Sequence, residues 1–267
     1  SIFVKFRYCD DAAALHPALA GKPVSFVIWT TTPWTLPANL AIALNPTFAY
    51  VAIEHEGEAL IVAKELAESV AKACGLAAPQ ILCEIDKERA DGTTCQHPFL
   101  DRTSLLVFGY HVTLEAGTGC VHTAPGHGEE DYHTGLAYKL EIYAPVDAAG
   151  RFTEEVPPYA GQLVFAANGP IVEELARRGA LLNKVGESVS HSYPHCWRCK
   201  KPVIFRATDQ WFCSLEHADL RQRALAAIDA TRWIPEWGHD RIEGMIANRP
   251  DWCLSRQRLW GVPLPVL

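Results

Sequence analysis

The sequence contains no apolar run long enough to cross a membrane, and residues 1–7 lack the apolar core of a signal peptide. These absences argue against a helical membrane protein and favour a cytoplasmic one. Methionine is nearly absent as well, because Met245 is the only one in 267 residues. A chain that starts at Ser1 and has its single methionine near the other end is expected to be a piece of a longer polypeptide.

Basic residues are too few for a broadly nucleic-acid-binding surface, since 24 Lys and Arg stand against 31 Asp and Glu, for a net charge of −7. The charges are unevenly distributed. Residues 191–267 hold 11 basic and 8 acidic residues (+3), whereas residues 1–190 hold 13 and 23 (−10). If RNA is a partner, its phosphates are therefore expected to meet the C-terminal quarter of the chain.

Nine cysteines, an odd number at irregular spacings, do not suit a disulfide framework. One pair, Cys196 and Cys199, has the spacing of a zinc knuckle. A closed structural zinc site needs four ligands, so this pair is half a site, which His191 and His195 could complete. The alternative interpretation is two thiols at a tight turn.

The spacing of apolar residues predicts several strands and helices. Strands are predicted at residues 24–29, 48–53, 59–62, 81–85, 105–108 and 120–123, with a turn at residues 56–57. Helices are predicted from about residue 63 to Gly75, from Pro170 to Gly179 with proline in the first turn, and over residues 220–230. Near residue 190 the chain becomes rich in aromatic, His and Cys residues. We therefore predict a first domain over residues 1–190 and a connector over residues 191–267.

Two polar segments stand out from this pattern. Residues 29–39 read Trp-Thr-Thr-Thr-Pro-Trp-Thr-Leu-Pro-Ala-Asn, and residues 117–131 read Gly-Thr-Gly-Cys-Val-His-Thr-Ala-Pro-Gly-His-Gly-Glu-Glu-Asp. Three hydroxyls at the end of an apolar strand pack poorly in a core but present hydrogen-bonding groups well. Each segment alone is also typical of a loop punctuated by Pro and Gly.

Together the two segments resemble the editing site of the isoleucyl-tRNA synthetases, and the resemblance covers essentially the whole chain. Residues 255–261, Ser-Arg-Gln-Arg-Leu-Trp-Gly, are similar to the segment that returns from the editing insertion to the catalytic domain of class I synthetases. The His-Ile-Gly-His and Lys-Met-Ser-Lys-Ser sequences of that catalytic domain are absent. The resemblance implies an α+β fold: a β-barrel-like editing core with peripheral helices, followed by a small Cys-containing connector, unable to aminoacylate alone.

The implied reaction is hydrolysis of valine attached wrongly to tRNA(Ile), with water attacking the aminoacyl ester and no covalent enzyme intermediate. A pocket that accepts isoleucine rejects valine only weakly, the isoleucyl enzymes being the standard example, because one methylene is worth about 1–3 kcal/mol. Residues 30–34 read Thr-Thr-Thr-Pro-Trp, whereas valyl and leucyl relatives have Thr-Thr-Arg-Pro and an acidic residue. The isoleucyl branch is therefore favoured over an editing domain of a valyl or leucyl relative.

The resemblance also assigns roles to single residues. Asp131 would pair with the α-ammonium group of the substrate, and His122 would bound the side-chain pocket and exclude isoleucine. From the sequence alone, Asp131 could instead cap a helix, and His122 could be a structural histidine. The hydroxyls that would bind the ribose and the ester belong to Thr30, Thr31 and Thr32. The residues assigned to substrate binding are Trp34, Asn39, His122 and Ala124.

The implied partners are the acceptor end of tRNA(Ile) carrying valine and the catalytic domain of the same full-length chain, with no membrane. Editing would require no cofactor, although the resemblance implies a zinc site in the full-length protein, with a second pair of ligands upstream of Ser1. Two other functions remain open. One is a metal-dependent hydrolase built on His122, His127 and Asp131, and the other is a non-catalytic RNA-binding module organised by the Cys pair.

Overall fold

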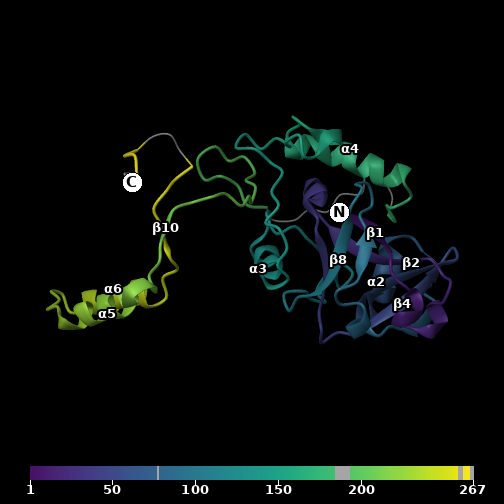
Figure 1. Ribbon diagram of the computed structural model, residues 1–267, viewed down its shortest axis with the longest axis horizontal. Coiled ribbons are helices and arrows are strands. Elements are labelled where there is room, and N and C mark those ends of the chain that lie inside the picture. Colours follow the sequence, from purple (N-terminus) through teal and green to yellow (C-terminus); the bar gives the residue numbers. More distant parts are fainter. Residues whose placement is uncertain (77, 184–192, 258–260, 265–267) are drawn as a thin grey trace. The chain divides into compact units, whose positions relative to one another are not determined.

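The computed structural model describes residues 1–76, 78–183, 193–257 and 261–264 (Figure 1). The chain divides into two compact units, Ser1–Ala207 and Thr208–Leu267. The domain boundary that we predicted near residue 190 falls in residues 184–192, outside the described residues. In the described part of the chain, no helix is long and apolar enough to cross a membrane.

The first unit contains a large sheet with helices around it, and the second contains two α-helices and a two-stranded sheet. The strands are β1 (Ile2–Tyr8), β2 (Val24–Thr30), β3 (Ala41–Leu44), β4 (Tyr50–His55), β5 (Glu58–Ala63), β6 (Ile81–Glu84), β7 (Thr94–Gln96), β8 (Thr103–Phe108), β9 (Cys120–Thr123), β10 (Phe212–Cys213) and β11 (Trp252–Cys253). The α-helices are α1 (Ala12–Leu15), α2 (Ala67–Ala73), α3 (Glu129–Ala137), α4 (Val164–Arg177), α5 (Leu220–Ala230) and α6 (Gly238–Ala247). Short 3-10 helices are η1 (Pro17–Leu19), η2 (Pro33–Ala38), η3 (Lys64–Leu66), η4 (Lys87–Arg89), η5 (Pro157–Tyr159) and η6 (His217–Asp219).

Nine strands form one mixed sheet in the order β6-β4-β5-β2-β1-β7-β8-β3-β9. β2 runs parallel to β5 and β3 runs parallel to β8, whereas the other neighbours are antiparallel. The two edge strands do not pair with each other, but β9 packs against β2. The amide of Ala63 also donates to the carbonyl of Thr118, just before β9, at 2.8 Å. The sheet therefore curls into the barrel-like α+β core that was expected.

Local signals in the sequence explain two of the connections. β4 and β5 form a two-residue hairpin in which Glu56 and Gly57 both have positive φ, 51° and 86°, as a type I′ turn requires. The predicted helix near residue 63 is present as η3 and α2. It ends at Gly75 in a left-handed cap, where the amide of Leu76 donates to the carbonyl of Ala71 and that of Gly75 to Lys72.

The prediction that a helix begins at Pro170 is wrong, because α4 begins at Val164 and contains that proline. The helix buries Val164, Ala167, Ile171 and Leu175, which lie on one face. This apolar face packs into the core. The free energy gained by burying it exceeds the cost of the lost hydrogen bond and the steric crowding at Pro170. Figure 1 shows α4 running beside the sheet of the first unit. The predicted elements also lacked strands β1, β3, β7, β10 and β11 and helices α1, α3 and α6.

The second unit is small and has little core of its own. Helices α5 and α6 pack together, and β10 pairs antiparallel with β11. Helix α5 confirms the prediction over residues 220–230. Among the described residues of this unit, the buried hydrophobic side chains are Leu215 and Ile228, whereas its large exposed ones include Trp211, Trp237 and Trp252.

Candidate functional site

The fold brings the two polar segments into direct contact. β2 ends at Thr30, and η2 leads from it to β3, which pairs antiparallel with β9. The hydroxyl of Thr35 lies 2.8 Å from Nε2 of His122. The rings of Trp34 and His127 meet edge to face, with centroids 5.0 Å apart. Two segments almost ninety residues apart in the chain thus form one site.

The three consecutive threonines differ in their surroundings. Thr30 is buried, and its hydroxyl accepts a hydrogen bond from the amide of Thr32 at 3.0 Å. Thr31 and Thr32 are half-buried, and their hydroxyls lie 3.4 Å apart. The Thr30 hydroxyl therefore stabilises the turn, whereas those of Thr31 and Thr32 contact each other.

His122 is a buried, neutral histidine with both ring nitrogens engaged. Nδ1 accepts from the side-chain amide of Asn39 at 3.1 Å, and Nε2 faces Thr35. Burial lowers the pKa of His122 to about 4, and the nearby His127 lowers it further in the same direction. Asn39 has no exposed surface, so a ligand in the site would not reach its amide directly. Its side chain instead orients His122.

Asp131 lies in the first turn of α3 and reaches back to the preceding loop. Its Oδ2 accepts from the amide of Ala124 at 2.8 Å, whereas the N-cap position of the helix is Gly128. Asp131 thus ties the loop to the helix without occupying the N-cap position. Burial raises the pKa of Asp131 to about 6; the Ala124 hydrogen bond opposes this shift, and the charge of Glu130 adds to it. Near neutral pH the carboxylate is therefore charged, although its surroundings disfavour the charge.

Trp34 and Ala124 are almost completely buried, with 2% and 1% of their surface exposed. The amide of Trp34 donates to the side-chain oxygen of Asn168 on α4 at 2.9 Å, which fixes η2 against that helix. His127 donates from Nδ1 to the carbonyl of Phe205 at 2.9 Å. Trp34 therefore holds η2 against α4, and His127 ties its loop to Phe205.

Sequence reasoning missed the residues that anchor η2 from the other side. His97 donates from Nε2 to the carbonyl of Leu36 at 2.9 Å, and Arg102 donates to the carbonyl of Pro37. Ser104, on β8, donates to the side-chain oxygen of Asn39 at 2.5 Å. The sequence gives no signal for them, because all three lie in a region without a recognisable motif.

The structure offers little support for the metal-dependent hydrolase. Both ring nitrogens of His122 and Nδ1 of His127 are already hydrogen-bonded. Over the described residues, three potential ligand atoms lie within 4.8 Å of one another only at His239, Asp240 and Glu243, in the second unit.

Cys196 and Cys199 lie on a tight turn. Cys196 is half-buried and Cys199 is exposed, and the amide of Lys200 donates to the carbonyl of Cys196 at 2.8 Å. Backbone N–H groups of Cys199 and Arg198 lower the pKa of the Cys196 thiol. The pair fits half of a tetrahedral zinc site by its chemistry. His195 is exposed and bonds to the carbonyl of Tyr193, and His191 lies outside the described residues, so the zinc site stays a prediction.

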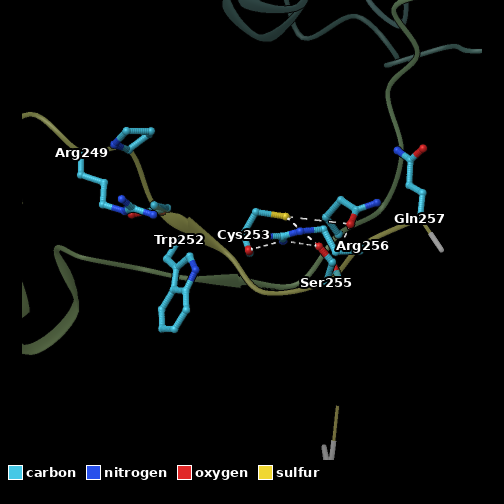
Figure 2. A pocket seen from close by; sticks show the side chains of 9 residues that line it. Arg249, Trp252, Cys253, Ser255, Arg256 and Gln257 are labelled. Atoms are coloured by element: carbon cyan, nitrogen blue, oxygen red, sulfur yellow. Dashed lines mark hydrogen bonds between the residues drawn. The ribbon is translucent and has the colours of Figure 1, made fainter. Parts of the chain in front are cut away.

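A cavity of about 750 Å³ lies in the second unit, along β11, and contains none of the predicted site residues. Figure 2 shows Arg249, Trp252 and Arg256 on its walls, with Arg256 donating to the carbonyl of Cys253 at 2.8 Å. Three of the residues that line it, Ser255, Arg256 and Gln257, belong to the segment that resembles the return to a catalytic domain.

The model of the class I tRNA synthetases for isoleucine, leucine, methionine and valine matches residues 22–267. The chain belongs to this family. It is 55% identical to an isoleucine–tRNA ligase of Geobacter sulfurreducens over 99% of its length, and 53% identical to one of Syntrophotalea carbinolica over 100%. The chain spans 28% of the length of both relatives.

Solved structures show the same fold at low identity. GlLeuRS-CP1 superimposes with a TM-score of 0.55 at 16% identity, covering 73% of this chain and 99% of that one. The editing domain of the cytosolic leucyl-tRNA synthetase of P. knowlesi does so with a TM-score of 0.51 at 10% identity, covering 68% and 96%. The α+β core of this class I synthetase chain is therefore that of the synthetase editing domains.

Proposed function

We propose that this chain hydrolyses valine from valyl-tRNA(Ile), as the editing domain of an isoleucine–tRNA ligase. The observation that carries the proposal is the junction of the two segments. The backbone carbonyl of Thr32 accepts from the Thr35 hydroxyl, which lies 2.8 Å from Nε2 of His122. His122 lies in the same segment as Asp131, which accepts from the amide of Ala124. The family and the close isoleucine–tRNA ligase relatives support the same substrate class.

Each element of the site suits one requirement of ester hydrolysis. A half-buried carboxylate can pair with the α-ammonium group, because away from bulk water a charge-assisted hydrogen bond is roughly twice as strong as a neutral one. Hydroxyls near the ester can donate to the oxyanion that develops during attack. Water is the nucleophile in this proposal. Thr31 and Thr32 orient the ester and the terminal ribose, and Asp131 holds the amino acid.

His122 limits the size of the amino acid in this proposal. Its ring is buried and held on both sides, so it cannot move aside to admit a larger side chain. Steric exclusion of isoleucine can exceed the roughly 1–3 kcal/mol that an attractive pocket gains from one methylene.

The test is the initial rate at which the chain releases amino acid from tRNA(Ile) charged with valine. We expect release above the spontaneous rate and its loss in Asp131→Asn. A wild-type rate equal to spontaneous hydrolysis would reject the proposal. The same assay in the presence of a strong chelator separates it from the metal-dependent alternative, which loses activity there.

A further inference from the structure

Two buried hydroxyls, those of Ser104 and Thr35, stand at the ends of a chain of hydrogen bonds through the site. Ser104 donates to Oδ1 of Asn39 at 2.5 Å, and the Asn39 amide donates to Nδ1 of His122 at 3.1 Å. Nε2 of His122 lies 2.8 Å from Thr35, whose hydroxyl donates to the carbonyl of Thr32 at 2.9 Å. We call these residues the relay.

Two backbone carbonyls, which can only accept hydrogen bonds, fix which atoms of the relay donate and which accept. The carbonyl of Ala41 accepts from the side-chain nitrogen of Asn39 at 2.8 Å, so that nitrogen also faces His122. Nδ1 of His122 therefore accepts, and the neutral ring carries its proton on Nε2. Because the carbonyl of Thr32 can only accept, the Thr35 hydroxyl donates to it and receives the Nε2 proton of His122 as a hydrogen bond.

The relay ends at the residue whose hydroxyl faces the ligand in the proposed reaction. The backbone of Thr32 is held at both ends, since its amide donates to Thr30 and its carbonyl accepts from the amide of Thr35 as well as from the hydroxyl. The Thr32 side chain remains half-buried. Clamping the backbone in this way fixes the position of the Cβ atom that carries the hydroxyl.

We infer that Ser104 and Thr35 are positioning residues for ester hydrolysis, which act through Asn39 and His122 to hold Thr32. This inference rests on the proposed function. A displacement of about 1 Å at a positioned group can reduce turnover roughly a hundredfold, so the relay controls kcat more than KM. Ser104 has no contact with a ligand in this scheme, because it is fully buried.

Substitutions at Thr35 test the lower end of the relay. Thr35→Val keeps the branched shape and deletes the hydroxyl, and we expect kcat for valyl-tRNA(Ile) to fall roughly tenfold to a hundredfold, with KM changed less than about twofold. Thr35→Ser restores the hydroxyl and should return kcat to within about threefold of wild type. Equal loss in both variants would mean that the methyl group packs and the hydroxyl does not position.

Ser104→Ala tests the upper end, with Ser25→Ala as a matched control. Both serines are buried and donate to a side-chain oxygen, that of Ser25 to Glu58 at the opposite end of β2. Losing either bond should lower the unfolding midpoint. We expect kcat to fall about threefold to tenfold only in Ser104→Ala. A similar kcat in the two variants would overturn the inference.

A double variant shows whether the two hydroxyls act as one unit. If they do, Ser104→Ala with Thr35→Val should have a kcat no lower than that of Thr35→Val alone, whereas independent losses would multiply and contradict the inference. The nitrogen resonances of His122, assigned with His122→Gln, give a readout that needs no activity. A protonated Nε2 and a bare Nδ1 in the wild type support the relay even if the proposed reaction fails, and the opposite tautomer refutes it.

Discussion

The two halves of the site are held by different kinds of interaction. In the segment from Thr30 to Asn39, the polar groups are fixed mainly by uncharged hydrogen bonds, apart from that of Arg102 to the carbonyl of Pro37, and most side chains are buried. In the segment from His122 to Asp131, burial displaces the pKa of both end residues, to about 4 and about 6. The first segment is therefore a hydrogen-bonded frame, whereas the second holds a carboxylate whose charge changes with pH near 6.

The largest effect is expected at the charged half, in Asp131→Asn. Asparagine keeps an oxygen for the amide of Ala124 but loses the charge, so we expect deacylation to fall about tenfold to a hundredfold, the worth of a charge-assisted hydrogen bond of about 1.5–3 kcal/mol. Asp131→Ala loses the Ala124 bond too. The measurement is the deacylation rate beside the unfolding midpoint of both variants.

Loss of the Asp131 charge, which should lower activity, should leave the stability of the fold unchanged or raise it. The pKa of Asp131 is raised in the folded chain, so the folded state binds this proton more tightly than the unfolded state. Its contribution to stability therefore falls as pH rises from about 4 to about 6 and stays low at pH 7. Asp131→Asn should unfold at the same or a higher temperature than wild type at pH 7. A clearly lower midpoint would make Asp131 a structural residue.

The uncharged half is tested by comparing its threonines. Thr31→Val and Thr32→Val keep the side-chain shape and remove hydroxyls whose only contact among the described residues is with each other, so we expect about tenfold slower deacylation and nearly unchanged melting. Thr30→Val removes the acceptor for the amide of Thr32 and should lower stability by about 1 kcal/mol. Melting that falls equally in all three variants, with turnover unchanged, would contradict this division.

His122 links the two halves, and His122→Ala should change selectivity. Removing the ring opens space for isoleucine and breaks the relay, so valine should be released more slowly while the preference for valine over isoleucine narrows. The change in that preference is expected to be about tenfold or more, because exclusion by contact is lost. Rates on tRNA(Ile) charged with each amino acid give the answer; an unchanged ratio would assign the size limit to another residue.

Mild acid should slow the reaction reversibly. Protonation of Asp131 removes the charge, so kcat/KM should fall as pH drops through about 6, reaching about a tenth of its maximum at pH 5. His122, with a pKa near 4, remains mostly neutral over this interval and cannot cause the decline. The control is Asp131→Asn, whose low residual rate should lack this titration. The same inflection in the variant would assign it to a different group.

Much of the fold followed from local patterns. The hairpin at Glu56 and Gly57 and the helix that ends at Gly75 have backbone requirements that the residue types reveal. Strand β3 was not predicted, because its Ala-Ile-Ala-Leu sequence has no alternation of apolar and polar residues and only one β-branched residue. The start of α4 was misplaced, because proline inside a helix is tolerated only when tertiary packing compensates.

The site was predictable only where the chain carries a motif. Both segments could be recognised, but the sequence could not show that Asn39 is fully buried or that the Thr30 hydroxyl is used within the turn. Ser104 and Arg102 reach the site through pairing of distant strands, and Asn168 through packing of α4. Such contacts depend on how distant strands and helices pack, so no short sequence pattern predicts them.

The most direct test of the proposed function is the ratio of initial deacylation rates on valyl-tRNA(Ile) and isoleucyl-tRNA(Ile), measured with the 267-residue chain at pH 7.5 or so. The account predicts release of valine well above the spontaneous rate, a ratio greater than about ten, and loss of that release in Asp131→Asn. Equal release of the two amino acids, or valine release that survives in Asp131→Asn, would contradict it.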